Sequence, residues 1–278
     1  MTHFAREDVE FLRAGLVQMD EYYRNNAEFL DRMRHITCFD HVQRVKGFVA
    51  EFLSTPQNPE DASSTVRDFV EEMAGMLSDH QLWREDGEDG YAQVSESLEK
   101  FLLQRLYNKV FTPLDSTDAE DDNQLYLSTR RLQFITPDHL DIPSRPLNKV
   151  AFHLAAEELA KLDSSKFSSP WEKLVCILNS ISILSNLLKH YGADEGTGAD
   201  ELLPYIIYTL ILLSPKHMYS NLRYVQRFRS ESKLRSEAAY YYTQMESAVL
   251  FISNADHKSF TISPDDFARG MREGRRSL

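Results

Sequence analysis

The sequence predicts an all-α protein. Three observations lead to this prediction: apolar residues recur at three- and four-residue steps through most of the chain, alternating strand-like patterns are scarce, and only 10 Gly and 10 Pro interrupt the 278 residues. A hydrophobic share of 42% beside 27% charged residues is typical of a folded globule rather than a disordered chain. The length indicates one large helical body or two packed subdomains.

Four amphipathic stripes in succession predict an N-terminal helical bundle. The stripes cover residues 8–37, 42–52, 66–77 and 94–106. The segments between and after them combine helix breakers with acidic residues, and we interpret their acidic runs as solvated loops. These segments are 54–64, 84–90 and 113–123.

A turn-rich segment at 135–146 separates the bundle from a more apolar second half. In that half, residues 173–190 and 201–213 are hydrophobic nearly all round, as core helices are. A tail follows, in which Ser263 and Pro264 precede two aspartates and predict a helix start. We therefore predict a bundle at 1–140, a second helical domain at 141–256, and a tail at 257–278 that packs back on the bundle.

Composition excludes several classes of function. The formal net charge of −12 argues against nucleic acid, whose binding depends on Lys and Arg, and against broad adsorption to anionic membrane. Cys38 and Cys176 are far apart and form no CxxC pair, which favours reduced thiols in the cytoplasm. The first residues contain no apolar signal core, and the stretch 202–213 is far shorter than the ~20 residues of a membrane span. We expect neither secretion nor a span.

Motifs of conventional enzymes are missing. The chain contains no phosphate loop, HExxH, GxSxG or dinucleotide fingerprint, and its nine histidines show no convincing metal-ligand spacing. We therefore expect neither a metal nor another cofactor. A metal- or carboxylate-dependent hydrolase would need a convergent ligand set, which the sequence does not offer.

Asp200 is the first candidate site residue. It follows a Gly-rich loop and precedes a hydrophobic helix in which Pro204 needs to lie near the start, because a proline deep inside a helix breaks its hydrogen bonds. Spacing alone favours a helix cap, whose carboxylate accepts from free backbone N–H groups.

Three consecutive tyrosines, Tyr240, Tyr241 and Tyr242, form the second candidate. Successive helical side chains point roughly 100° apart, so the three cannot all enter one core. At least one faces solvent, a groove or a partner, although an exposed tyrosine alone is more often plain surface.

Several strings resemble the Vps-nine (vacuolar protein sorting nine) domain of Rabex-type and plant exchange factors. The strings are KLVCILN (173–179), GADELLPYIIY (198–208), SNLRYVQRFR (220–229) and SEAAYYYTQMESAVLFIS (236–253). The segments 29–49, 98–111 and 134–142 resemble the helical bundle that precedes this domain. The resemblance covers roughly residues 29–262 and implies that the segment 141–256 is a guanine-nucleotide exchange domain.

The resemblance implies a site and a partner. The family's aspartate at the position of Asp200 acts as an acidic finger in the nucleotide site of a GTPase, and Tyr240 matches the tyrosine that contacts switch I. Pro204 and Thr243 match other signature positions, and Ser185 stands where asparagine is frequent. The implied partner is a Rab GTPase of the early-endosomal subfamily in its GDP-bound or nucleotide-free state. The resemblance also implies that this chain is cytoplasmic and is recruited peripherally to early endosomes.

Helical spacing extends the predicted GTPase-binding face along the helix that follows Asp200. The face comprises Pro204, Ile207, Tyr208 and Ile211. Core burial is an equal alternative for the two isoleucines. A non-catalytic helical adaptor that binds a Rab is the alternative function, but it has no need of an acidic finger.

Overall fold

The computed structural model describes residues 6–55, 58–192, 199–229 and 236–276. Within these ranges all regular structure is helical, which confirms the predicted fold class. The helices are α1 (Arg6–Leu12), α2 (Asp20–Met33), α3 (Phe39–Ser54), α4 (Pro59–Ser78), α5 (Gly87–Val110), α6 (Asp118–Arg131), α7 (Asn148–Ala160), α8 (Pro170–His190), α9 (Ala199–Leu213), α10 (Met218–Phe228), α11 (Glu237–Asn254) and α12 (Pro264–Arg276). None of the described helices has the length and apolar content to cross a membrane.

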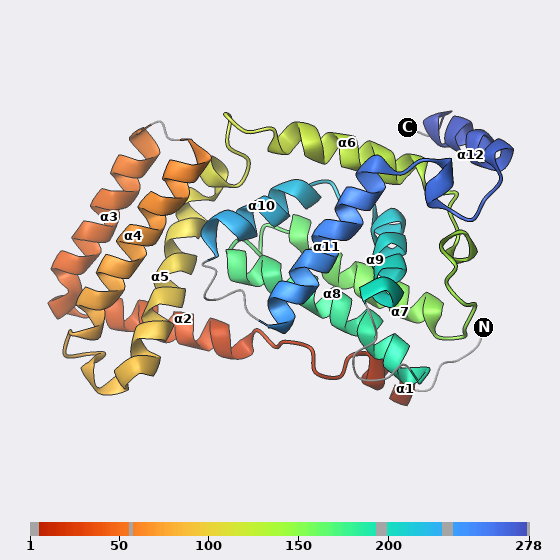
Figure 1. Ribbon diagram of the computed structural model, residues 1–278. Helices are drawn as coiled ribbons and strands as arrows, with labels where there is room; N and C mark the ends of the chain where they lie inside the picture. The colour runs from red at the N-terminus through yellow and green to blue at the C-terminus, as the bar shows by residue number, and fades with distance from the viewer. Residues whose placement is uncertain (1–5, 56–57, 193–198, 230–235, 277–278) are drawn as a thin grey trace.

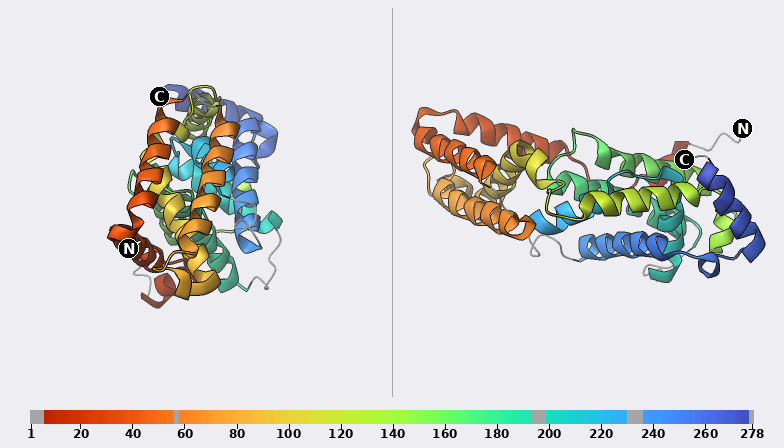
Figure 2. Two further views of the ribbon diagram at one scale, coloured as in Figure 1. Left: turned by 90° about the vertical axis from the view of Figure 1, so that its left-hand side faces the viewer. Right: turned by 90° about the horizontal axis from the view of Figure 1, so that it is seen from above.

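The molecule is elongated, with the bundle of α2 to α5 at one end and the helices α7 to α9 and α11 toward the other (Figure 1, Figure 2). Each part has its own hydrophobic core. The bundle core comprises buried side chains between residues 29 and 110 together with Tyr224 and Phe228 of α10. The distal core comprises Leu12, buried side chains from α6 to α11, and Phe260. The predicted bundle stripes at 42–52, 66–77 and 94–106 form α3, α4 and α5.

Helix α10 joins the two cores. Tyr224 is fully buried, and its ring meets the rings of Tyr107 and Phe111 edge-on, each with centroids 5.6 Å apart. Its hydroxyl donates to the Ser168 carbonyl at 2.9 Å, just before α8 begins. One aromatic residue from the second half therefore completes the core of the bundle and also contacts the turn before α8, a helix of the distal core.

A buried ion pair lies at the same junction. The Lys100 Nζ of α5 donates to Glu172 Oε1 of α8 at 2.6 Å, and both side chains are almost completely buried. The second oxygen, Glu172 Oε2, accepts from the backbone N–H groups of Ser168 and Ser169 at 3.0 and 2.9 Å, which caps α8. Lys100 also lies over the rings of Tyr22 and Tyr23 of α2. The pair thus connects two helices of the bundle with α8.

The predicted stripe at 8–37 is wrong as one continuous helix. The chain leaves α1, turns at Gly15 with φ of +70°, and resumes helical structure at Asp20. Side-chain amides of α8 hold the intervening segment: Asn179 bonds both the N–H and the C=O of Val17, and Asn186 donates to the Leu12 carbonyl. Backbone groups that a helix would pair internally are paired with α8 instead.

Two helices of the predicted bundle segment also contribute to the distal core. Helices α1 and α6, both within the range 1–140, contribute Leu12 and Leu125 to the distal core. The tail forms α12, which Ser263 caps, and the Phe267 ring packs edge-on against Phe134 beside α6. The helix therefore packs on α6 rather than on α2 to α5. The limits of independently folding domains, at 140 and 256, stay a prediction.

We predict that Lys100→Met destabilises the protein by about 3–5 kcal/mol, because it leaves the Glu172 carboxylate buried without its counter-charge. Chemical denaturation of the variant and the wild type measures the difference. Arg44→Met is the matched control: it breaks an exposed ion pair with Glu72 between α3 and α4 and should cost no more than about 1 kcal/mol. Equal losses in the two variants would contradict the role of the buried pair.

A second prediction concerns Lys173, whose fully buried Nζ donates to the Leu162 carbonyl at 2.8 Å. Burial lowers the pKa of this amine from 10.5 to about 8. Between these values the unfolded chain binds more protons than the folded one, so the contribution of Lys173 to the free energy of unfolding rises with pH. The stability of the wild type minus that of Lys173→Met should therefore rise by about 1 kcal/mol per pH unit in this window. Denaturation at several pH values measures this difference. Lys166→Met, at an exposed position, is the control: the stability of the wild type minus that of this variant should not rise with pH.

Candidate functional site

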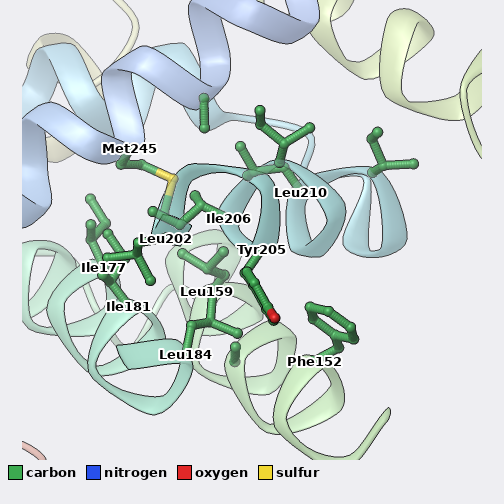
Figure 3. Close-up of a cluster of buried hydrophobic side chains, with 14 of the residues drawn as sticks. Phe152, Leu159, Ile177, Ile181, Leu184, Leu202, Tyr205, Ile206, Leu210 and Met245 are labelled. Carbon is green, nitrogen blue, oxygen red and sulfur yellow. The ribbon is translucent and has the colours of Figure 1, made fainter. Parts of the chain in front are cut away.

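Helix α9 occupies the centre of the distal core. Figure 3 shows it between α11, which contributes Met245, and the helices α7 and α8, which contribute Phe152 and Leu184. Leu202, Ile206 and Leu210 are buried along its length. The nearly continuous hydrophobicity of this segment therefore reflects packing on several sides, as predicted, and the exposed part of α9 is small.

The three tyrosines separate as helical geometry requires. Tyr241 and Tyr242 are buried, and the Tyr242 hydroxyl donates to the Leu222 carbonyl of α10 at 2.7 Å. Tyr240 is 39% exposed, with its ring centroid 5.6 Å from that of Tyr241. The first turn of α11 therefore presents one aromatic side chain to the outside while two others anchor the helix.

Tyr240 borders a hollow of about 350 Å³ between the end of α8 and the starts of α9 and α11. The lining residues are Ser185, Leu188, Lys189, Leu202, Ser236, Glu237, Tyr240 and Tyr241. Ser185 forms a side-chain hydrogen bond with Tyr241, although burial still raises the pKa of that tyrosine. Tyr240 and the first turn of α9, about 40 residues apart in sequence, thus lie beside one hollow.

Asp200 is the second residue of α9, in its first turn. Its side chain lies outside the described part of the structure, so the choice between cap and finger stays open here. Pro204 lies inside α9 as its sixth residue and is half-buried. Because proline has no N–H, the Asp200 carbonyl lacks the helical donor that another residue at 204 would supply.

The predicted face along α9 does not continue beyond Pro204. Ile207 is 2% exposed and Ile211 is 1% exposed, both within the distal core, so the surface prediction for these isoleucines is wrong and the core alternative holds. Packing of α7, α8 and α11 around α9 turns this face inward. Tyr208 is half-buried against the Phe152 ring, with centroids 4.7 Å apart, and lines a different hollow, between α7 and α9.

Helix α11 supplies an exposed stripe that was not predicted in full. Thr243, one turn beyond Tyr240, is exposed, and its hydroxyl donates to the Ala239 carbonyl. Leu250 continues the same row and is 60% exposed, which is unusual for leucine. The row 240, 243, 247, 250 has helical spacing, so extending the pattern from Tyr240 would have found it.

Comparison with known proteins gives two family matches. The vacuolar sorting protein 9 (VPS9) domain matches residues 152–257, and a domain of unknown function (DUF5601) matches residues 43–107. The first contains α9 and α11, and the second contains most of the bundle from α3 to α5.

Relatives extend across most of the chain. Vacuolar protein sorting-associated protein 9A of Oryza sativa subsp. japonica is 37% identical over 248 residues, which is 88% of this chain and 51% of that protein. Its namesake in Arabidopsis thaliana is 36% identical over 89% of this chain and 48% of its own length. The Rab5 GDP/GTP exchange factor of Homo sapiens is 27% identical over 96% of this chain and 50% of its own length. The chain spans about half the length of the curated relatives that it matches.

These matches show that the chain belongs to the VPS9 domain family, with the VPS9 domain preceded by a helical bundle.

Proposed function

We propose that this chain is a guanine-nucleotide exchange factor for a Rab5-type GTPase, and that it acts peripherally at early endosomes without covalent chemistry. The observation that carries the proposal is the position of a half-exposed Tyr240 beside the first turn of α9, where Asp200 stands. Relatives named as Rab5 GDP/GTP exchange factors support it. The GTPase would meet this surface in its GDP-bound or nucleotide-free state.

The proposed mechanism begins with charge. A small GTPase holds its nucleotide through Mg²⁺ and a lysine on the phosphates. A carboxylate from Asp200 in that site would repel the phosphate and pair with the lysine in its place, as charge-assisted hydrogen bonds favour. The nucleotide would then lose two of its main contacts.

Charge alone cannot release a nucleotide. A hydrogen bond to a charged group contributes about 1.5–3 kcal/mol, much less than nucleotide binding requires. The remainder must come from a surface that binds the nucleotide-free GTPase better than the loaded one, since exchange is a shift between two states driven by differential affinity. We assign this surface to Tyr240, Thr243 and Leu250 of α11 together with Pro204 of α9.

We predict that Tyr240→Ala slows GDP release by about tenfold or more, the effect of losing one central aromatic contact. Its helical circular dichroism and melting temperature should remain close to the wild type, because the side chain is 39% exposed. Release of fluorescent GDP from a Rab5-type GTPase is the measurement. Tyr91→Ala in α5, another exposed tyrosine, is the control and should leave exchange unchanged. Unfolding of Tyr240→Ala would instead assign this ring to the core.

A further prediction separates the charge of Asp200 from its capacity to cap α9. Asp200→Asn should abolish most exchange and leave the melting temperature unchanged, because Asn caps about as well as Asp but carries no charge. Asp200→Ala should abolish exchange and also cost about 1 kcal/mol of stability. Near-normal GDP release with Asp200→Asn, on a GTPase that the wild type activates, would falsify the acidic finger. Binding of a Rab by the wild type without any acceleration of GDP release would instead favour the non-catalytic Rab-binding adaptor.

A further inference from the structure

The bundle carries a hollow of its own. The bundle helices lie toward the opposite end of the molecule from α9 (Figure 1, Figure 2). Helices α2 and α3 both pack on α5, and the short 3₁₀ helix Ile36–Cys38 connects them at a corner. Between the three helices lies a groove of about 560 Å³, which we call the bundle groove. Its lining residues are Asn26, Phe29, Leu30, Met33, Arg34, His35, Ile36, Phe39, Val42, Gln43, Val45, Lys46, Leu98, Phe101, Gln104 and Arg105.

The apolar side chains of the bundle groove are arranged by depth. Phe29, Val45 and Leu98 are buried in the bundle core and form the floor. Half-buried side chains form the walls; they are Leu30, Met33, Val42 and Phe101. At the rim, Ile36 is 79% exposed and Phe39 is 57% exposed. A contiguous apolar surface of this kind, open to solvent and concave, is typical of a binding site rather than of scattered exposed residues.

Charge at the rim has one sign. Arg34, Lys46 and Arg105 line the bundle groove, and among the residues that the structure describes no Asp or Glu does, although the whole chain has a net charge of −12. The Arg105 guanidinium lies 3.4 Å from the centroid of the Phe101 ring, which holds it at the wall. Asp31 pairs with Arg34 on the exposed side of α2. An occupant with acidic side chains beside an apolar face would match this distribution.

We propose that the bundle groove binds an acidic amphipathic helix of another polypeptide. Its apolar residues, spaced at i, i+3, i+4 and i+7, would enter the groove, and its flanking Glu or Asp would meet the three cations. A second copy of this chain fits less well, because two bundle grooves facing each other would oppose cations of like charge. A membrane fits less well, because the groove is concave and the chain as a whole is acidic.

Two synthetic helical peptides of about 18 residues, five turns, test the proposal on the whole chain. Both carry the same Leu and Phe face; one has Glu on both flanks and the other has Lys. Fluorescence anisotropy should show the Glu peptide binding at least about tenfold tighter than the Lys peptide. The double variant Ile36→Asp, Phe39→Asp should weaken the Glu peptide by about tenfold or more.

Matched controls separate the groove from general effects. Leu114→Asp changes another exposed hydrophobic residue and should leave peptide binding intact. Exchange activity should be the same in all these variants, because none alters α9 or α11. Equal affinity of the two peptides would overturn the proposal, as would a Glu peptide insensitive to Ile36→Asp, Phe39→Asp. Two further outcomes would also overturn the proposal. If the wild type binds anionic phospholipid vesicles and only the double variant does not, the surface belongs to a membrane. If the wild type is a dimer by light scattering and only the double variant is not, the surface belongs to a second copy.

Discussion

The arrangement of the two cores depends on the buried contact between Lys100 and Glu172. Glu172 caps α8 with one oxygen and accepts from α5 with the other, so a single carboxylate fixes the start of α8 and its position on the bundle. Because α8 runs from this cap to the hollow that Tyr240 borders, the ion pair sets where the far end of α8 meets α9 and α11. Breaking it would disturb both ends of the same helix.

Burying an ion pair costs desolvation energy that an apolar contact would not, so its value here lies in specificity of docking. Apolar contacts alone do not fix the register of the bundle against the distal core, whereas Lys100 meets Glu172 in one register only. Arg229, which pairs with Glu96 and Glu99 of α5, adds a second directional contact from the end of α10. The buried Tyr224 adds a third polar contact, because its hydroxyl donates to the Ser168 carbonyl in the turn before α8. We infer that polar groups set the relative position of the cores and that hydrophobic burial provides the stability.

Periodicity predicted the helices because it records which faces are buried, and the stripes of α3, α4 and α5 appear where the pattern places them. The periodicity wrongly predicted a helix at residues 13–19. There, side-chain amides of α8 form hydrogen bonds with backbone groups that a helix would pair internally. The periodicity failed again at Ile207 and Ile211, because a helix that is apolar all round contains no information about which side meets solvent. The three adjacent tyrosines predicted that at least one ring lies outside the core, and the family resemblance, not the spacing, singled out Tyr240. Long-range contacts between α8 and the N-terminal segment are absent from any local pattern.

The burial of α9 constrains how an exchange factor built this way could work. Beyond its first turns, the side chains of this helix pack against α7, α8 and α11. The part of α9 that is available to a GTPase is therefore short. Helix α11 lies on the outside and offers an apolar and hydroxyl row from Tyr240 to Leu250, long enough for an extended contact. A rigid, deeply packed α9 also holds its first turn in a fixed place, which lowers the cost of presenting a charge there. In the proposed exchange mechanism, α9 would deliver the charge and α11 would provide most of the surface that recognises the partner, and the shared core beneath them would hold the two helices together.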